Sequence, residues 1–279
     1  MGAHSCTRRE LLGRIGVGTA SAMAAACLSS CRPGSEEKPL RPKADEKKPT
    51  HIVTLSFDDG FRKSSIRTAE IYEKHKLSAC INVIATGHVN TFKPPDEYMV
   101  ASDRGDFGLW NELKQRGHEI MPHGYRHANK AQMPFAQAKD LILRCLEYFC
   151  KELKGFEPKD AVFNFPYNAS TPELESWLPT QVKAFRTGGG AINPLPHAGQ
   201  VKLTCASFGP GNCERDIEEK IAQLLARDSG WLIYNTHGLD AEGWGPIRSS
   251  FLDDLLARLT AIDSVAVMPA ARCVAQPYC

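Results

Sequence analysis

The 279-residue sequence predicts an α/β fold in which parallel strands close into a barrel. Apolar, β-branched runs alternate with segments of helical spacing from His51 onward, and no long hairpins separate them, which favours β-α units and a parallel sheet. Polar side chains suited to chemistry also follow several predicted strands, as they do in barrels whose sites lie where strands end. About 230 residues suffice for one domain with a barrel-sized core.

Elements in the first part of the chain are predicted from apolar runs and their spacing. Residues 52–57 form a β-branched run typical of a strand, and 64–75 carries apolar residues at helical spacing. The next apolar strand is 80–84. Residues 85–108 are expected to be irregular, and loops of this length in a compact domain are usually functional rims or disordered segments.

The later elements follow the same alternation. Residues 135–153 form the clearest amphipathic helix, because their apolar residues recur on one stripe. A short helix begins at Thr171-Pro172, where proline suits the first turn. The remaining expected strands are 117–122, 161–165, 184–187, 230–236 and 265–268, and the remaining helices are 109–116, 216–227 and 251–261.

Composition and charge fit an ordinary soluble globular chain, with 42% hydrophobic and 24% charged residues. The formal net charge is +2, and the first 30 residues carry this excess through Arg8, Arg9 and Arg14 against Glu10. Removing these from 34 basic and 32 acidic residues leaves 31 of each sign. A balanced body argues against nucleic acid as the main partner.

Residues 1–30 are predicted to be an export signal. Thr7-Arg8-Arg9-Glu10-Leu11-Leu12 is typical of a twin-arginine signal, and the weakly apolar run that follows is too short to span a membrane. Leu28-Ser29-Ser30-Cys31 resembles a bacterial lipobox, which would make Cys31 the lipidated first residue of the mature protein. Ordinary cleavage nearby and use of Cys27 are the alternatives.

Residues 31–50 are rich in proline, lysine and glutamate and are expected to form a flexible tether. The folded domain is then 51–279. The sequence therefore predicts a protein exported to the periplasm or cell envelope, which meets the membrane through a lipid anchor. Export permits disulfides, and Cys205–Cys213 or Cys273–Cys279 could close short loops, although burial as small apolar residues is the plainer interpretation.

Two adjacent carboxylates end the first predicted strand, in Ser56-Phe57-Asp58-Asp59-Gly60. They repel each other, so a positive partner is expected nearby, and the glycine allows a sharp turn after them. His123 and His127 are spaced i and i+4, which predicts that both imidazoles lie on one side of a helical turn, as paired zinc ligands require. Carboxylates and histidines together predict a metal site.

Four motifs in this order resemble the polysaccharide deacetylase family (NodB homology, carbohydrate esterase family 4), over about residues 50–270. They are Ser56-Phe57-Asp58-Asp59-Gly60, Gly117-His118-Glu119-Ile120 leading to His123-x-x-x-His127, Phe165-Pro166-Tyr167, and a strand that ends in His237. The resemblance implies a distorted (β/α)7-type barrel and removal of N- or O-acetyl groups from a polysaccharide or oligosaccharide. The implied cofactor is a divalent metal, often zinc.

The resemblance also implies roles for individual residues. Asp59, His123 and His127 would hold the metal, Asp58 would be the general base, and His237 the general acid. The backbone N–H of Tyr167 would donate to the oxyanion. This division suits amide hydrolysis, because three protein ligands leave coordination positions open for water and substrate and imidazole titrates in the range that an acid near neutral pH needs.

The sequence departs from the family pattern near the expected substrate pocket. Asn164 stands where the family usually has an arginine two residues before Pro166, and Asn235 stands where a leucine often lines the pocket for the acetyl methyl group. No partner for His237 is evident, although Asp240 is close in sequence. Trp244 is expected either to stack on a sugar ring or to cap the barrel.

Two alternative functions stay open at this point. The first is hydrolysis of a linear amide that is not a sugar, which the polar Asn235 makes less remote. The second is a catalytically silent glycan-binding module that keeps the fold.

Overall fold

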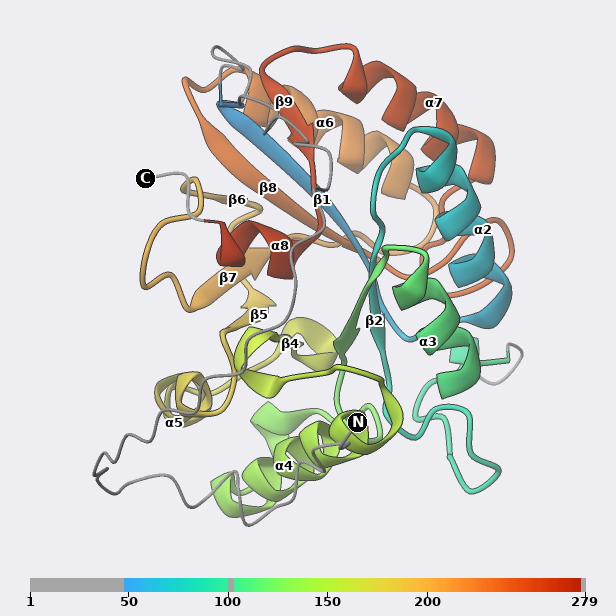
Figure 1. Ribbon diagram of the computed structural model, residues 1–279, viewed down its shortest axis with the longest axis vertical. Helices are drawn as coiled ribbons and strands as arrows, with labels where there is room; N and C mark the ends of the chain where they lie inside the picture. The colour runs from blue at the N-terminus through green and yellow to red at the C-terminus, as the bar shows by residue number, and fades with distance from the viewer. Residues whose placement is uncertain (1–47, 100–102, 277–279) are drawn as a thin grey trace, which may run out of the picture.

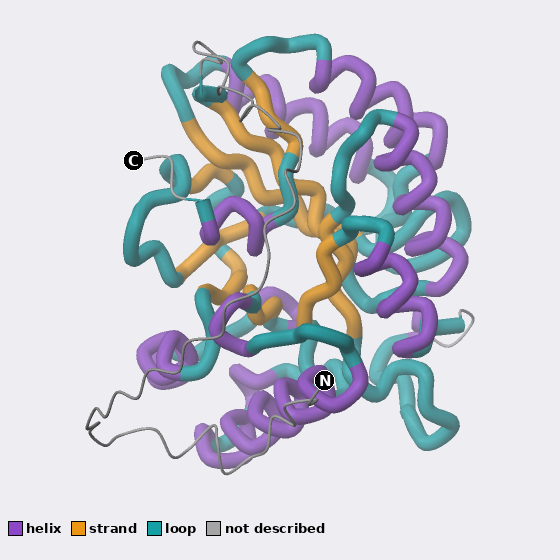
Figure 2. Tube along the Cα trace, viewed as in Figure 1, coloured by secondary structure: helices purple, strands orange, loops and turns teal. Residues whose placement is uncertain are grey.

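A computed structural model describes residues 48–99 and 103–276, with parallel strands at its centre (Figures 1 and 2). The predicted export signal and most of the predicted tether lie outside these residues. The strands are β1 (His51–Phe57), β2 (Cys80–Val83), β3 (Glu119–Pro122), β4 (Val162–Asn164), β5 (Ala184–Gly188), β6 (Ile192–Asn193), β7 (Lys202–Cys205), β8 (Gly230–Thr236) and β9 (Val265–Val267).

The strands form two hydrogen-bonded sheets that together make a distorted barrel. One sheet contains the order β3-β2-β1-β8, and the other is β4-β5-β7. A parallel bridge between Ala206 and Tyr234 joins β7 to β8. Between β3 and β4 the described residues form no strand pairing, but the Asn164 side chain donates to the Pro122 carbonyl oxygen over 3.5 Å. The predicted single-domain α/β fold is confirmed, with this opening as the distortion.

Helices lie outside the strands, and α2, α3, α6 and α7 lie beside the sheet that holds β1 and β8 (Figure 1). The α4 and α5 helices lie near β4. The bounds are α2 (Arg62–Lys74), α3 (Phe107–Gln115), α4 (Phe135–Glu152), α5 (Pro172–Trp177), α6 (Cys213–Leu225), α7 (Ser249–Thr260) and α8 (Ala270–Ala275). No helix among the described residues is long and apolar enough to cross a membrane.

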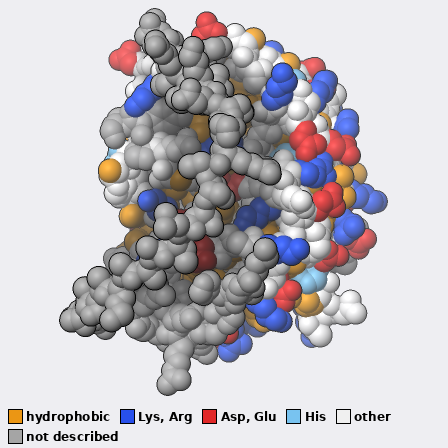
Figure 3. All heavy atoms as spheres, in the orientation of Figure 1, with side chains coloured by type: hydrophobic (Ala, Val, Ile, Leu, Met, Phe, Trp, Pro, Cys, Tyr) orange, Lys and Arg blue, Asp and Glu red, His pale blue; other side chains and the backbone are white. Residues whose placement is uncertain are grey.

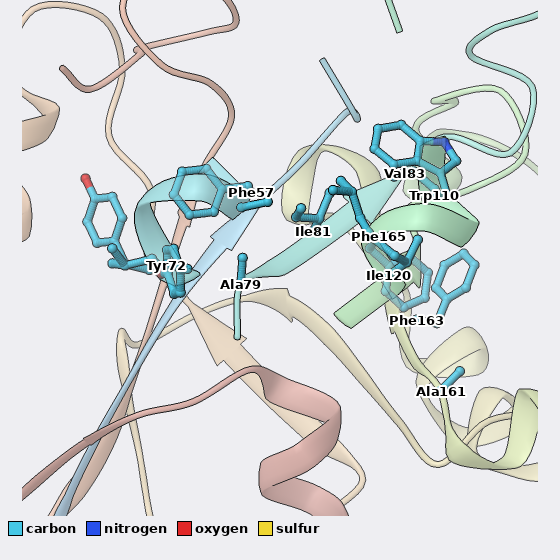
Figure 4. Close-up of a cluster of buried hydrophobic side chains, with 14 of the residues drawn as sticks. Phe57, Tyr72, Ala79, Ile81, Val83, Trp110, Ile120, Ala161, Phe163 and Phe165 are labelled. Carbon is cyan, nitrogen blue, oxygen red and sulfur yellow. The ribbon is translucent and has the colours of Figure 1, made fainter. Parts of the chain in front are cut away.

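Side chains on the outer face of the strands pack against the helices. Phe57, Ile81 and Ile120 point outward from successive strands into the main hydrophobic cluster. There they lie with Tyr72 of α2 and Trp110 of α3, as the close-up in Figure 4 shows. Burial of this face stabilises the fold by roughly 25 cal/mol per Å² of apolar surface removed from water.

Side chains on the inner face change character along the barrel. Near the start of the strands they are apolar, and α8 packs against them to close that end; the cluster contains Ile52, Cys80, Val162, Ala184, Leu203, Trp231 and Ile233 with Ala270, Ala271, Cys273 and Val274. Toward the ends of the strands the buried inner residues are polar, and they include Ser56, Asp58, Asn82, Asn164, Arg186 and Asn235. The polar layer therefore lies at the end where the predicted site residues lie.

Several element boundaries and one predicted contact differ from expectation. The α3 helix begins at Phe107, two residues before its predicted start, because the Asp106 carboxylate accepts a hydrogen bond of 3.0 Å from the Leu109 N–H and caps the helix. The disulfide considered between Cys205 and Cys213 does not form, because both residues are free thiols. The Cys205 thiol donates to Asn168 Oδ1, and the Cys213 thiol donates to the Phe208 carbonyl oxygen. Cys279 lies outside the described residues.

Charged side chains of both signs are interspersed on the right of Figure 3, where Figure 1 shows helices α2, α3 and α7. Some of them join neighbouring helices: Lys74 of α2 lies 2.6 Å from Asp253 of α7, and Arg258 of α7 pairs with Glu218 of α6. Exposed pairs of this kind contribute little to stability. Their effect is to keep the outer helix faces solvated.

Candidate active site

Asp58 and Asp59 lie in the turn that follows β1, and both are buried. The chain turns through two consecutive residues of positive φ, Asp59 at +74° and Gly60 at +68°. A Cβ atom at Gly60 would lie 3.0 Å from Trp110 Cζ2 and 3.1 Å from Val83 Cγ1. Glycine is therefore required both by the left-handed backbone and by the close approach of the core.

His123 directly follows β3, and His127 lies in an irregular loop rather than on the predicted helical turn. The loop passes through Gly124 at φ +86° and His127 at +50°, which no regular helix contains. A Cβ at Gly124 would lie 2.9 Å from Lys130 Nζ and 3.1 Å from Pro166 Cγ. The predicted proximity of the two imidazoles is correct, with ring centroids 5.2 Å apart, but its predicted cause is wrong.

Asp59, His123 and His127 bring together one potential metal-ligating atom each, all within 4.8 Å of one another. Asp59 Oδ1 lies 3.2 Å from His127 Nε2 and 3.5 Å from His123 Nε2. Ligands at about 2.1 Å from a tetrahedral zinc ion are separated by roughly 3.4 Å. Both Asp59 carboxylate oxygens are buried without a hydrogen-bond partner among the described residues, so the donor set fits a divalent cation.

The backbone of β4 orients the His123 ring. Its Nδ1 lies 3.1 Å from the Asn164 carbonyl oxygen, which only accepts hydrogen bonds, so Nδ1 carries the proton. Nε2 is then the nitrogen that faces the two carboxylates, at 3.5 Å from an oxygen of Asp59 and of Asp58. This is the arrangement by which an outer carbonyl orients a histidine ligand.

Arg186 of β5 holds Asp58, a contact that the sequence did not predict. Its Nη2 donates to Asp58 Oδ2 over 2.5 Å, and its Nη1 donates to Asp58 Oδ1 over 3.1 Å and to Ser56 Oγ over 2.8 Å. Asn82 of β2 donates to the same carboxylate over 2.7 Å. Both carboxylate oxygens of Asp58 therefore accept hydrogen bonds from groups that keep it ionised, and Oδ2 accepts only one of these bonds.

Asn164, which stands where the family usually has an arginine, does not hydrogen-bond to Asp58. Its side-chain amide donates to Asn82 Oδ1 over 2.8 Å, and Asn82 in turn holds Asp58. Asn164 and Arg186 are register partners in the parallel pair β4 and β5. The guanidinium therefore reaches the carboxylate from the strand next to the expected one.

Burial and neighbouring charges act in opposite directions on the two carboxylates. Burial alone would raise the pKa of Asp58, but the Arg186 guanidinium and then His123 outweigh it and lower the pKa below its usual range. Burial also opposes ionisation of Asp59, and His127 and His123 more than offset it, so that pKa is lowered too. Both carboxylates are ionised at neutral pH.

His237 follows β8 and lies between two aromatic rings. Its ring is edge-on to Trp244 at 5.5 Å between centroids and to Tyr98 at 6.3 Å. Burial lowers the pKa of His237, and the charges of Asp59 and Asp58 oppose that shift. Asp240 does not orient this histidine, because its carboxylate accepts from the Ser249 N–H and hydroxyl at the start of α7.

Tyr167 lies in the short turn Pro166–Asn168 at φ +59°, with its ring 4.7 Å from that of His127. Its hydroxyl donates to Asp96 Oδ2 over 2.8 Å, and the same oxygen lies 3.7 Å from His127 Nδ1. Asp96 was not singled out from the sequence, although it belongs to segment 85–108, which was expected to be irregular. Tyr98 comes from the same segment.

These groups surround one cavity of about 320 Å³. It contains the expected base, acid and histidine ligands, together with Asn235 and Trp244 from the expected substrate pocket. Asn164 and Pro166 do not line it, and both are buried. The lining residues are Asp58, Asp96, Tyr98, His123, His127, Tyr167, Asn168, Ser207, Asn235, His237 and Trp244.

Solved structures with this fold include deacetylases. The chain is similar to a Mycobacterium smegmatis protein assigned to the polysaccharide deacetylases, with 14% identity, a TM-score of 0.64, and coverage of 85% of this chain and 93% of that one. It is also similar to a family 4 carbohydrate esterase from Streptomyces lividans in complex with acetate, at 15% identity, TM-score 0.51 and coverage of 80% and 95%. At such identities the likeness shows the fold.

A third similar structure is the Bc1960 peptidoglycan N-acetylglucosamine deacetylase, with 15% identity, a TM-score of 0.54, and coverage of 85% of this chain and 98% of that one. No curated protein sequence matches the chain. The family model described as polysaccharide deacetylase matches residues 45–203, which is more than half of the sequence. The chain therefore belongs to the polysaccharide deacetylase family.

Proposed function

We propose that this chain is a metal-dependent hydrolase that removes N- or O-acyl groups, acetyl in the simplest case, from a polysaccharide or oligosaccharide. The observation that carries the proposal is the convergence of Asp59, His123 and His127 at one point, with Asp58 and His237 lining the same cavity. A closed structural metal site would use a fourth protein ligand. Two histidines and one carboxylate suit zinc, which is the cation we propose.

A divalent cation held by Asp59, His123 and His127 would lower the pKa of water from about 15.7 toward roughly 7 and would polarise the acyl carbonyl. Asp58 takes the proton from the attacking water, and Arg186 keeps its carboxylate ionised and fixed for that purpose. The Tyr167 backbone N–H donates to the developing oxyanion. Positioned donors of this kind typically contribute about 10²–10³-fold in rate.

His237 donates a proton to the departing nitrogen or oxygen. It must be protonated when the acyl bond breaks, and Asp58 and Asp59 raise its proton affinity against the effect of burial. A positioned acid or base typically contributes about 10²–10⁴-fold. We therefore expect His237→Ala to lower the rate of acyl hydrolysis. Substitution of a metal ligand should lower this rate further, because it removes both water activation and charge stabilisation.

We also propose that the protein is exported and acts in the periplasm or cell envelope, tethered by lipid at Cys31. Support comes from the sequence of the first 50 residues, with its paired arginines and lipobox-like Leu28-Ser29-Ser30-Cys31. Mass spectrometry of the mature N-terminus tests this directly. A mature chain that begins away from Cys31, or carries no lipid, would refute the anchor.

The test of the proposed activity is a zinc titration followed by acid-release assays on acetylated chitooligosaccharides, acetylxylan and peptidoglycan. We expect stoichiometric zinc binding and metal-dependent release of acid from at least one of them. Asp58→Asn should still bind zinc but lose turnover by about 10²–10⁴-fold. Asp228→Asn, an exposed carboxamide substitution of the same kind, should match the native protein.

The remaining outcomes separate the alternatives. Zinc binding with glycan binding but no acid release from any substrate would favour a silent binding module. Release from simple linear amides, with none from glycans, would favour a hydrolase of a non-sugar amide. Native turnover in Asp58→Asn would remove this residue from the role of base.

A further inference from the structure

The cavity has a closed inner end and an open mouth, and these ends suit different parts of a substrate. Asn235 forms the inner wall, where it is 4% exposed and its side-chain amide lies 3.4 Å from the Ser56 carbonyl oxygen, in the strand that leads to Asp58. Tyr167, at 44% exposed, stands at the mouth. A sugar polymer fits only at the mouth, so the small acyl group occupies the inner end.

No aliphatic side chain lines this cavity among the described residues. Three aromatic rings line it, and each of them contacts a histidine. Tyr98 and Trp244 flank His237, which lies on the side of the leaving group, and Tyr167 covers His127. An acetyl methyl group at the inner end would therefore meet amide groups. Polar groups left facing a methyl group lose hydrogen bonds to water without replacement.

Three polar side chains form a row from the inner end to the mouth. The Asn168 amide donates to Asn235 Oδ1 over 3.1 Å and to Ser207 Oγ over 3.4 Å. Asn168 Oδ1 accepts from the Cys205 thiol. The row is thus held from behind by β7 and β8, which fixes the orientation of its amides.

The orientation of Asn235 leaves an acceptor directed into the cavity. Its Nδ2 faces the carbonyl oxygens of Ser56 and Thr236, at 3.4 and 3.2 Å, and carbonyls only accept hydrogen bonds. Its Oδ1 accepts one bond from Asn168 and has a second lone pair unused. A hydroxyl at the inner end would donate to this oxygen and accept from Asn168 in place of the long bond to Ser207.

We infer that the acyl group removed by this chain carries a hydroxyl on the carbon next to its carbonyl, as in a 2-hydroxyacyl group of which glycolyl is the smallest, and that Asn235 and Asn168 bind that hydroxyl. The inference rests on the proposed function and names its substrate class. The reaction is plain hydrolysis: water adds its oxygen to the carbonyl carbon, the C–N bond breaks, and the products are glycolate and the free sugar amine, which takes the proton.

The test compares three N-acyl groups on one β-1,4-linked glucosamine tetramer, using the zinc-loaded protein. Glycolyl and propionyl have the same number of heavy atoms, so they differ in polarity but hardly in size, and acetyl is the smaller reference. We expect kcat/KM for glycolyl to exceed that for propionyl and acetyl by about tenfold or more, as one or two net hydrogen bonds would give. Calorimetry on Asp58→Asn should give the same order of affinities.

Asn235→Leu identifies the residue that selects the acyl group. It replaces the acceptor with an aliphatic group of similar size, so the preference for glycolyl should fall about tenfold or more while acetyl and propionyl gain. Asn168→Ala, at a half-buried site, should move the preference the same way and serves if Asn235→Leu does not fold. Asn90→Leu, on an exposed loop outside the cavity, should keep the native preference.

Three results would overturn the inference in distinguishable ways. Equal or faster release of acetate by the native protein would refute the hydroxyl preference and leave the deacylase function standing. A glycolyl preference that survives in both variants would assign hydroxyl binding to the metal or another group. No acid from any tetramer, despite bound zinc, would refute the proposed function itself, and the inference with it.

Discussion

The arginine that holds Asp58 comes from β5, one strand away from the position that the family pattern indicates. Side chains at paired positions of neighbouring parallel strands point to the same face, so Asn164 and Arg186 both point into the barrel. The guanidinium is fully buried and Asp58 is its carboxylate partner. Because a buried charge needs a partner, each residue of this pair depends on the other.

Removing Arg186 should therefore damage both stability and turnover. Arg186→Met leaves the Asp58 carboxylate buried with only neutral donors, and we expect a loss of about 3–5 kcal/mol in the free energy of unfolding. Acid release should fall by about 10² or more as the base loses its orientation. Urea unfolding and steady-state kinetics measure the two effects.

An exchange of the two side chains tests whether position or presence of the arginine matters. Asn164→Arg combined with Arg186→Asn should recover part of the lost stability and activity, because both positions face the same carboxylate. Arg258→Met, which removes an exposed ion pair, is the matched control and should cost under about 1 kcal/mol. An exchanged variant no better than Arg186→Met would contradict this account.

At the scale of elements, the turn between β1 and α2 positions a residue of the candidate metal site. It places Asp59 at a positive φ and brings Gly60 against Trp110 of α3 and Val83 of β2. The position of a ligand is thus tied to core packing through one glycine. Interiors are packed too densely to absorb an added methyl group without a shift.

Gly60→Ala should destabilise the fold and weaken zinc binding together. The backbone at φ +68° costs about 1 kcal/mol for a residue with a Cβ, and overpacking against Trp110 adds about 1–3 kcal/mol. Gly199→Ala is a matched control at φ +80°, since its Cβ would meet nothing within 4 Å and only the backbone cost applies. Equal effects from the two variants would show that packing at Gly60 is unimportant.

Most elements could be predicted from the sequence, including short ones such as β4 and α5, but β6, β7 and α8 could not. The predicted strand 230–236 matches β8, and the predicted helix 135–153 differs from α4 by one residue at its end. The β7 strand, with lysine and threonine among four residues, becomes a strand through pairing with β5. The β6 strand has two residues and α8 six, too few for a periodic pattern.

The grouping of the candidate site residues could be predicted from the sequence, but their contacts could not. Asp58, Asp59, His123, His127 and His237 stand in recognisable local motifs, and the structure brings them to one cavity or beside it. The contacts of Arg186 and Asp96 depend instead on strand register and on the path of a long loop. The spacing of residues along the chain reveals neither the strand register nor the path of the loop.

For the whole molecule, the two ends of the barrel have different chemistry. The polar end holds the site, whereas the other end is closed by α8, whose Ala271 and Arg272 N–H groups donate to the buried Glu119 of β3. Burial raises the pKa of Glu119, and these backbone donors oppose that shift. Its neighbour His118 is buried as well, so the closed end contains a buried carboxyl group and a buried imidazole away from the candidate active site.

His118 should make stability fall as the solution becomes acidic. The Ala79 N–H donates to its Nδ1 over 3.1 Å, which requires a neutral ring with the proton on Nε2, toward Glu73. Burial lowers the pKa of His118 below 6.5, with Glu73 opposing. Between pH 6.5 and the lowered folded-state pKa the unfolded chain binds more protons, so stability is lost as pH falls through this window.

Glu119 acts in the opposite sense, because a raised folded-state pKa gives stability that is present at low pH and lost as pH rises. A single variant separates the two contributions. In His118→Asn the side-chain oxygen can still accept from Ala79 but does not titrate, so the free energy of unfolding should depend less on pH between 6.5 and 5. His197→Asn, at an exposed site, should keep the native slope. Urea unfolding at several pH values measures it, and an unchanged slope in His118→Asn would exclude His118 as its source.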